Sequence, residues 1–159
     1  MTDAIKKYGG YLLLIPIGLF LVIFVAPIFL LALLWDKIIG YWLNVRFRLK
    51  HKFPKKNILF IYSNSPNWKD YIDDNLLDKL QPSTIFLNWS ERSNWNTSQL
   101  EVKVFKHWAS DREFNPMAIV FEENSKVRTI RFYKAFKNRN HGDEKLLQLK
   151  EKELFSYVN

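Results

Sequence analysis

Apolar residues form one long uninterrupted run near the start of the chain. No charged residue occurs between Tyr8 and Trp35, and residues 11–35 read YLLLIPIGLFLVIFVAPIFLLALLW. As a helix these residues would rise about 37 Å, which is more than the hydrocarbon core of a bilayer, about 30 Å. The run is longer than the apolar core of a cleaved signal peptide, and no small-residue cleavage pattern follows it. The pattern predicts an N-terminal flank over residues 1–10 and one tilted transmembrane helix over residues 11–35, kinked at Pro27.

Beyond residue 56, short apolar runs alternate with amphipathic ones. The runs that predict strands are 57–62, 84–89, 117–121 and 127–133, and those that predict helices are 67–80, 100–108 and 143–157. Residues 100–108 fit both a helix and a strand, and we favour the helix. The first strand, helix and second strand form a βαβ unit with parallel strands, and the polar turn 123–125 predicts a hairpin. We therefore expect a small α/β domain with a mixed sheet over residues 57–159, whose first helix begins at Ser65 as N-cap.

The net charge of +8 is concentrated between these two regions. Residues 37–56 contain seven basic side chains and no acidic one, whereas residues 57–159 contain 15 basic and 14 acidic side chains. By the positive-inside rule, this excess predicts a cytoplasmic soluble domain. The juxtamembrane segment 36–56 is expected either to lie on anionic lipid or to act only as a topology determinant. Its membrane-surface candidates are Arg46, Arg48, Lys50, Lys52, Lys55 and Lys56. A folded part with so little net charge does not predict nucleic acid as a partner.

Composition excludes several kinds of chemistry. The chain has no cysteine, which excludes disulfides, thiolate zinc sites and a dithiol reaction carried by this chain alone. None of its five glycines lies between residues 41 and 141, which excludes a P-loop and a dinucleotide fingerprint there. The three histidines are widely scattered, and the four aspartates of residues 70–78 spread around one helix. We therefore predict no metal site, no cofactor and no catalytic residue.

The order of the predicted elements resembles the thioredoxin-like superfamily. The segments that carry the resemblance are ILFIYSNSPNWKDYI over residues 58–72, NPMAIVF over residues 115–121, and the last strand and helix. The resemblance implies a cis bond between Asn115 and Pro116, and it places Ser65 and Trp68 at the positions of the family's redox cysteines. Because a hydroxyl cannot form a mixed disulfide, thiol–disulfide exchange is not carried over. Cysteine-free members such as the glutathione transferases use a hydroxyl near this helix start, which implies a possible role for Ser63 and Ser65.

The resemblance also implies where a ligand would bind. The loop 63–68 and the Asn115–Pro116 segment would meet at the carboxyl ends of the strands, where open α/β sheets bind ligands. The candidate ligand-binding residues are Ser63, Ser65, Trp68, Arg92, Arg112, Asn115 and Pro116, with Trp95 beside them. The alternative is that the tryptophans belong to the core and that Ser65 only caps a helix.

Three functions follow from these patterns. We expect a membrane-tethered, non-redox binding or scaffold module that has a protein partner at the membrane. The alternative is a membrane-anchored enzyme of the transferase type, which would use the loop 63–68 and an anionic or thiol ligand. In a third possibility, the soluble domain only stabilises a membrane complex.

Overall fold

The computed structural model describes residues 14–52, 55–109, 115–122, 124 and 126–158. The predicted N-terminal flank and the first three residues of the predicted transmembrane helix lie outside these ranges. The contacts of the chain divide it into two compact units, Met1–Tyr41 and Trp42–Asn159.

The apolar run is helical, as predicted. Leu14–Lys50 forms one helix that is long and apolar enough to cross a membrane. It contains a π-helical turn, η1 (Leu21–Val25), followed by α2 (Ala26–Lys50). The N–H of Ala26 donates to the carbonyl of Leu21, which is five residues back, and Pro27 comes next in the chain. Because Pro27 has no N–H and its ring crowds the preceding turn, an irregular turn is expected at this place.

The second unit is built on a four-stranded mixed sheet with the strand order β2-β1-β3-β4. The strands are β1 (Ile58–Tyr62), β2 (Thr84–Asn88), β3 (Met117–Phe121) and β4 (Val127–Arg131). β1 pairs in parallel with β2 and antiparallel with β3, and β3 pairs antiparallel with β4. The mixed sheet, the parallel strands of the βαβ unit and the hairpin that the sequence predicts are therefore confirmed.

The first helical segment of this unit is irregular and starts later than predicted. It runs through α3 (Lys69–Ile72), η2 (Asp73–Leu77), α4 (Asp78–Leu80) and η3 (Gln81–Ser83). The N-cap position is Trp68, which makes no side-chain capping bond. Ser65 acts mainly through its backbone, since its carbonyl accepts from the N–H of Lys69 at 2.9 Å, whereas its hydroxyl lies 3.4 Å from the N–H of Asn67. Ser65 therefore caps the turn that leads into α3, as the sequence predicts, although the assigned helix itself begins after Trp68.

Two of the other helical elements agree with the sequence, and two were not predicted. η4 (Trp89–Asn94) follows β2, and α5 (Leu100–Trp108) and α7 (Lys145–Phe155) lie within or at the predicted helical runs. β4 ends at Arg131, however, and a helix that was not predicted, α6 (Tyr133–Arg139), follows it. The side chains of Ala135 and Phe136 are buried and hold α6 on the core.

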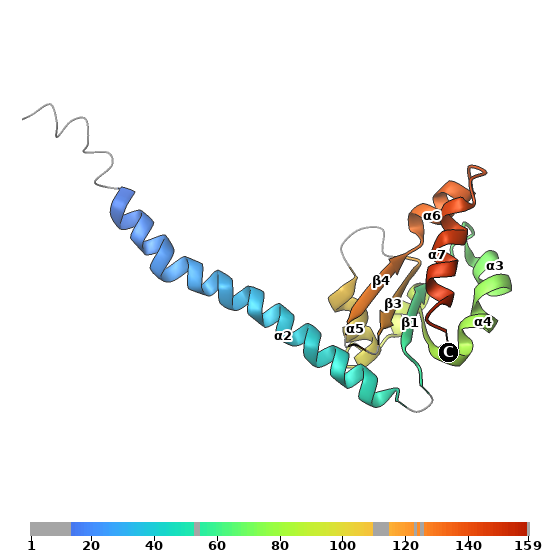
Figure 1. Cartoon of the computed structure of the whole chain (residues 1–159), viewed down its shortest axis with the longest axis horizontal. Helices are drawn as coiled ribbons and strands as arrows, with labels where there is room; N and C mark the ends of the chain where they lie inside the picture. The colour runs from blue at the N-terminus through green and yellow to red at the C-terminus, as the bar shows by residue number, and fades with distance from the viewer. Residues whose placement is uncertain (1–13, 53–54, 110–114, 123, 125, 159) are drawn as a thin grey trace, which may run out of the picture. The chain divides into compact units, whose positions relative to one another are not determined.

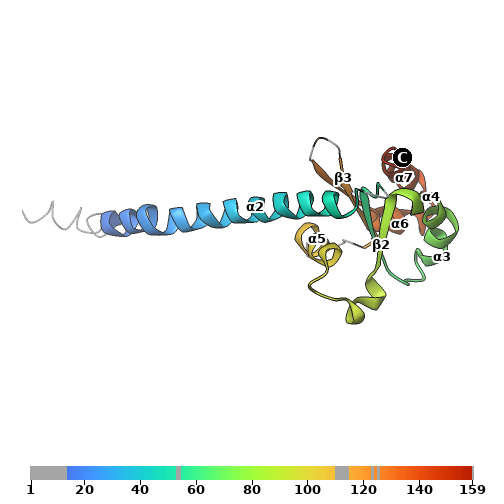
Figure 2. The same cartoon turned by 90° about the horizontal axis from the view of Figure 1, so that it is seen from below.

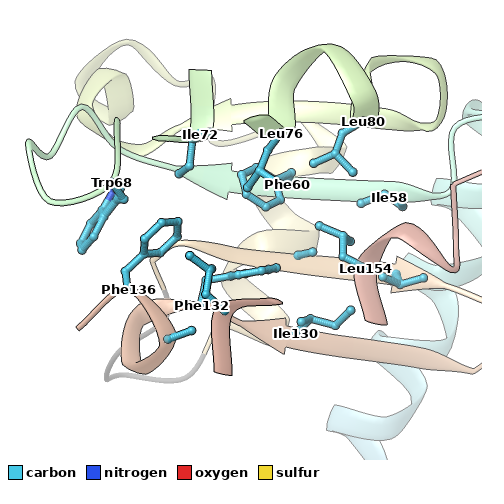
Figure 3. Packing of buried hydrophobic residues seen from close by; sticks show 14 residues of the cluster. Ile58, Phe60, Trp68, Ile72, Leu76, Leu80, Ile130, Phe132, Phe136 and Leu154 are labelled. Carbon is cyan, nitrogen blue, oxygen red and sulfur yellow. The ribbon is translucent and has the colours of Figure 1, made fainter. Parts of the chain in front are cut away.

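Helices cover both faces of the sheet. α3, α4, α6 and α7 lie on one side and α5 lies on the other (Figures 1 and 2). Figure 3 shows the core of the first side, in which Phe60 and Ile58 of β1 meet Ile72, Leu76 and Leu154. Because side chains alternate along a strand, the other face of the sheet carries a second set of buried residues, which are Leu59, Ile61, Met117, Ile119 and Phe121.

The end of α2 belongs to this second unit. Leu43 and Phe47 are buried, and the ring of Phe47 stacks on that of Phe121 with a centroid distance of 4.0 Å. The unit therefore begins at Trp42, whereas the hydrophobic pattern predicts a domain start at residue 57. The predicted juxtamembrane segment is helical as far as Lys50, and one of its faces is part of a core.

Candidate functional site

Trp68 and Ser63 pack against each other at the end of β1. The indole N–H of Trp68 donates to the carbonyl of Ser63 at 3.2 Å and lies 3.3 Å from its hydroxyl oxygen. Ser63 is buried, and only 9% of Trp68 is exposed. The Trp68 ring lies 6.2 Å from Tyr133 and 6.1 Å from Phe136, in the cluster of Figure 3. Trp68 is therefore a core residue, which is the alternative that the sequence left open.

The loop after β1 is tied to the loop after β2. The N–H of Asn64 donates to the hydroxyl of Ser90 at 2.9 Å, and the amide of Asn88 donates to the side-chain oxygen of Asn64 at 3.0 Å. The side-chain oxygen of Asn88 accepts from the N–H of Ser90, and this hydrogen bond caps η4. Ser65 is half-exposed beside this network. It is the one candidate hydroxyl that solvent reaches, because Ser63 is buried.

The guanidinium of Arg92 makes its contacts within its own loop. It lies 5.0 Å from the centroid of the Trp89 ring and donates to the carbonyl of Trp89 at 3.3 Å. Trp89 and Trp95 in turn pack against Phe105 of α5, with ring centroids 5.4 and 5.6 Å away. Arg92 and Trp95 thus belong to a small cluster, built around Trp89, that packs against Phe105 of α5. Arg112, the other predicted arginine, lies outside the described residues.

Asn115 and Pro116 precede β3 at the same end of the sheet at which Ser63 follows β1. The Asn115–Pro116 bond is cis, as the resemblance implies. Met117 pairs with Ile61 near the end of β1, so Pro116 and Ser63 lie at one end of paired strands. The Pro116 carbonyl accepts from the N–H of Phe132 at 2.9 Å. The side-chain oxygen of Asn115 is buried and has no hydrogen-bond partner among the described residues.

Two surface depressions flank the contact between Trp68 and Tyr133. The first has a volume of about 300 Å³, and Trp68 lines it together with Asp70, Tyr71 and Arg139. The second has a volume of about 330 Å³ and is lined by Tyr133, Lys134, Lys137 and Asn138. Ser63, Ser65, Arg92, Asn115 and Pro116 line neither of these two depressions. Several predicted ligand residues therefore lie at one end of the sheet, but of those that the structure describes, only Trp68 lines either of these two depressions.

Tyr71 is the most perturbed titratable group of the first depression. Burial, together with the neighbouring Glu151 carboxylate, raises the pKa of Tyr71 to about 12, and the guanidinium of Arg139, 4.4 Å from the ring centroid, acts in the opposite direction. Tyr71 is thus a neutral phenol at physiological pH. Within the described ranges, no group of three or more His, Asp or Glu side chains could hold a metal ion.

Some of the basic juxtamembrane residues have partners inside the second unit. The ammonium of Lys50 and the imidazole of His51 both donate to one oxygen of Glu101, at 2.8 and 2.6 Å, and Glu101 is 1% exposed. The guanidinium of Arg48 donates to the side-chain oxygen of Asn44 at 2.7 Å. Arg48 and Lys50 are therefore held by protein groups. Arg46, Lys52 and Lys55 are exposed, and Lys56 is half-exposed.

Burial and hydrogen bonding act against each other at this cluster. Burial alone would raise the pKa of Glu101, but the hydrogen bonds from Lys50, from the backbone and from His51 prevail and hold it below its ordinary value. Burial lowers the pKa of His51 despite the Glu101 carboxylate beside it. No local pattern of the sequence marks Glu101, because its partners lie about 50 residues earlier in the chain.

A second acid-free segment lies within residues 57–159, whose near-neutral total charge does not reveal it. Residues 124–142 contain no acidic side chain and six basic ones, which are Lys126, Arg128, Arg131, Lys134, Lys137 and Arg139. This segment supplies every residue of the second depression. A charge count over short windows would have found it.

The chain was compared with known proteins at the level of families, sequences and structures. No family model, no curated protein and no solved structure matches it.

Proposed function

We propose that this chain is a membrane-tethered, non-redox binding or scaffold module with a thioredoxin-like domain. The apolar helix serves as the anchor, the soluble domain lies in the cytoplasm, and a protein partner binds it at the membrane. The observed order of strand, helical segment, strand, helix, hairpin and closing helix supports the thioredoxin-like assignment. The absence of cysteine means that the chain alone cannot carry out dithiol exchange.

The observation that carries this proposal is the position of Trp68. The resembled family has a reactive cysteine at this position, whereas here a large ring is built into the core and hydrogen-bonded to Ser63. A residue that is 9% exposed and packed between Tyr133 and Phe136 stabilises the fold and supplies no redox-active group at this position. This position therefore contributes packing and no redox chemistry, which supports a binding or scaffold module.

The structure narrows the proposed contact with anionic lipid. Arg48 and Lys50 are bonded to Asn44 and Glu101, so we assign the lipid contact to Arg46, Lys55 and Lys56. The guanidinium of Arg46 lies 4.6 Å from the ring centroid of Trp42, and both residues are exposed. Each basic residue near an anionic surface contributes about 1 kcal/mol to membrane attraction. The same charges support the cytoplasmic orientation.

The transferase alternative depends on Ser65, the solvent-accessible hydroxyl of the loop. The full chain in nanodiscs is assayed for glutathione binding by calorimetry and for conjugation of an electrophilic aromatic substrate. A binding module should show neither, and Ser65→Ala should behave like wild type. The matched control is Ser93→Ala, which alters an exposed serine of η4. Conjugation that is lost in Ser65→Ala and retained in Ser93→Ala would overturn the proposal in favour of the enzyme.

A further inference from the structure

Two cations line the depression on α6, and none of its described lining residues is acidic. Tyr133, Lys134, Lys137 and Asn138 enclose about 330 Å³ of open space, and none of the four carries a negative charge at neutral pH. Lys134 and Lys137 are three positions apart on a helix, so their ammonium groups extend from one face. Both are exposed. Two like charges at this spacing repel each other, which is a cost that a bound anion would remove.

Carboxylates neutralise several other cations of the domain. Arg128 is paired with Glu122 and Glu153, Arg139 with Glu144, and Lys150 with Glu153. Lys134 and Lys137 have neither an ion pair nor a hydrogen bond to any described residue. Carboxylates from neighbouring segments thus neutralise Arg128 and Arg139 of the acid-free segment 124–142. The lysines of α6 remain available to bind an external group.

The depression also lies at the ligand-binding end of the sheet. Phe132, next to Tyr133, donates to the carbonyl of Pro116, and the Tyr133 ring lies 6.2 Å from that of Trp68. These contacts place the hollow beside the loop that follows β1, and open α/β sheets bind ligands at this end of their parallel strands. The depression thus lies near the place where the resemblance implies a ligand, but its lining residues come from α6 and were not among the predicted candidates.

We propose that this depression binds a phosphate monoester group. Such a group carries a charge of about −1.5 to −2 at pH 7, which matches two ammonium groups, whereas a carboxylate carries half of that. Lysine binds phosphate as a compact point charge with three donors. The Tyr133 hydroxyl and the Asn138 amide add neutral donors on the same wall. A lining of this kind suits a small charged group more than an apolar ligand.

The experiment uses the full chain, with isotope-labelled backbone and Asn side chains, in phosphatidylcholine nanodiscs. Inorganic phosphate is titrated at constant ionic strength, with chloride as the reference, and NMR follows the amides of residues 133–138. Saturable shifts that centre on these residues are expected. Lys134→Gln with Lys137→Gln should raise the dissociation constant about tenfold or more. The matched control changes two exposed lysines of α7, Lys145→Gln with Lys152→Gln, and should leave the dissociation constant unchanged.

A second arm replaces part of the lipid by phosphatidic acid, whose headgroup is a phosphate monoester. A response to inorganic phosphate assigns the site to a soluble phosphorylated compound. A response only to phosphatidic acid, with the same dependence on the α6 lysines, assigns it to a lipid headgroup. Equal responses of the two double variants, an equal response to chloride, or no response in either arm would overturn the proposal. So would binding of polyglutamate, but not of phosphate, that depends on the α6 lysines.

Discussion

Phe47 near the end of α2 stacks face to face on Phe121 of β3, with ring centroids 4.0 Å apart and an interplanar angle of 14°. The two side chains are separated by most of the domain in sequence, and neither is accessible to solvent. This contact shows that the last turns of the long helix are part of the domain core. We therefore expect the part of the chain that folds alone to start at Trp42.

A shortened chain that starts at Trp42 should unfold cooperatively in urea, whereas one that starts at Lys55 lacks Leu43 and Phe47 and should be less stable. In the longer chain, Phe47→Ala should lower the free energy of unfolding by about 3–5 kcal/mol, because it removes a buried ring and leaves a cavity. Leu49→Ala, on the same helix but 70% exposed, should change it by less than about 0.5 kcal/mol. Equal stability of the two chains would contradict the boundary at Trp42.

The buried contact of Glu101 with Lys50 and His51 should make the stability of the domain depend on pH. The pKa of His51 is below its ordinary value of 6.5, so the unfolded state takes up a proton first and stability falls as the pH drops below 6.5. The pKa of Glu101 is below its ordinary value of 4.5, so a second loss starts as the pH drops below 4.5. Urea titrations followed by tryptophan fluorescence between pH 7.5 and pH 4 should show that His51→Gln removes the first loss. A His51→Gln slope identical to that of wild type would show that another group titrates.

Trp68 should be required for stability and not for binding. Trp68→Ala removes a buried aromatic ring and should cost about 3–5 kcal/mol. Trp68→Phe keeps the contacts with Tyr133 and Phe136 but loses the hydrogen bond to Ser63, and should cost about 1 kcal/mol. Thermal unfolding measures both changes. If Trp68→Phe left stability unchanged and abolished partner binding, Trp68 would be a recognition residue.

The proposed orientation can be tested because the chain has no cysteine of its own. Leu149 of α7 is exposed, so Leu149→Cys introduces one accessible thiol. A membrane-impermeant maleimide should label this thiol only after the cells are permeabilised. Labelling in intact cells would place the domain on the other side of the membrane.

The sequence predicted those parts of the fold that depend on local patterns. The run 11–35, the four strands and the α5 helix follow from hydrophobic periodicity, and the parallel pairing of β1 and β2 follows from the short βαβ connection. α6 was missed because a helix of seven residues shows too few turns of a 3.6-residue pattern. The alternation that predicted a strand to Tyr133 ends at Arg131, where the chain turns to bury Phe132 and Phe136.

The candidate site was harder to predict because it depends on contacts between distant residues. The sequence placed Ser63, Trp68 and Pro116 at one end of paired strands, which agrees with the register of β1 and β3. It could not show that the Trp68 indole turns back to Ser63, or that Arg92 stacks on Trp89. The pairing of Lys50 with Glu101 spans 51 residues and likewise leaves no local pattern.

Native mass spectrometry of the full chain, extracted with its surrounding lipid from the membranes in which it is expressed, tests the binding function most directly. A binding or scaffold module should carry a protein partner at a fixed stoichiometry. Ser65→Ala should keep that partner, because the loop hydroxyl has no part in binding. A bare chain in every preparation, or a partner replaced by a small molecule that Ser65→Ala releases, would contradict the proposed function.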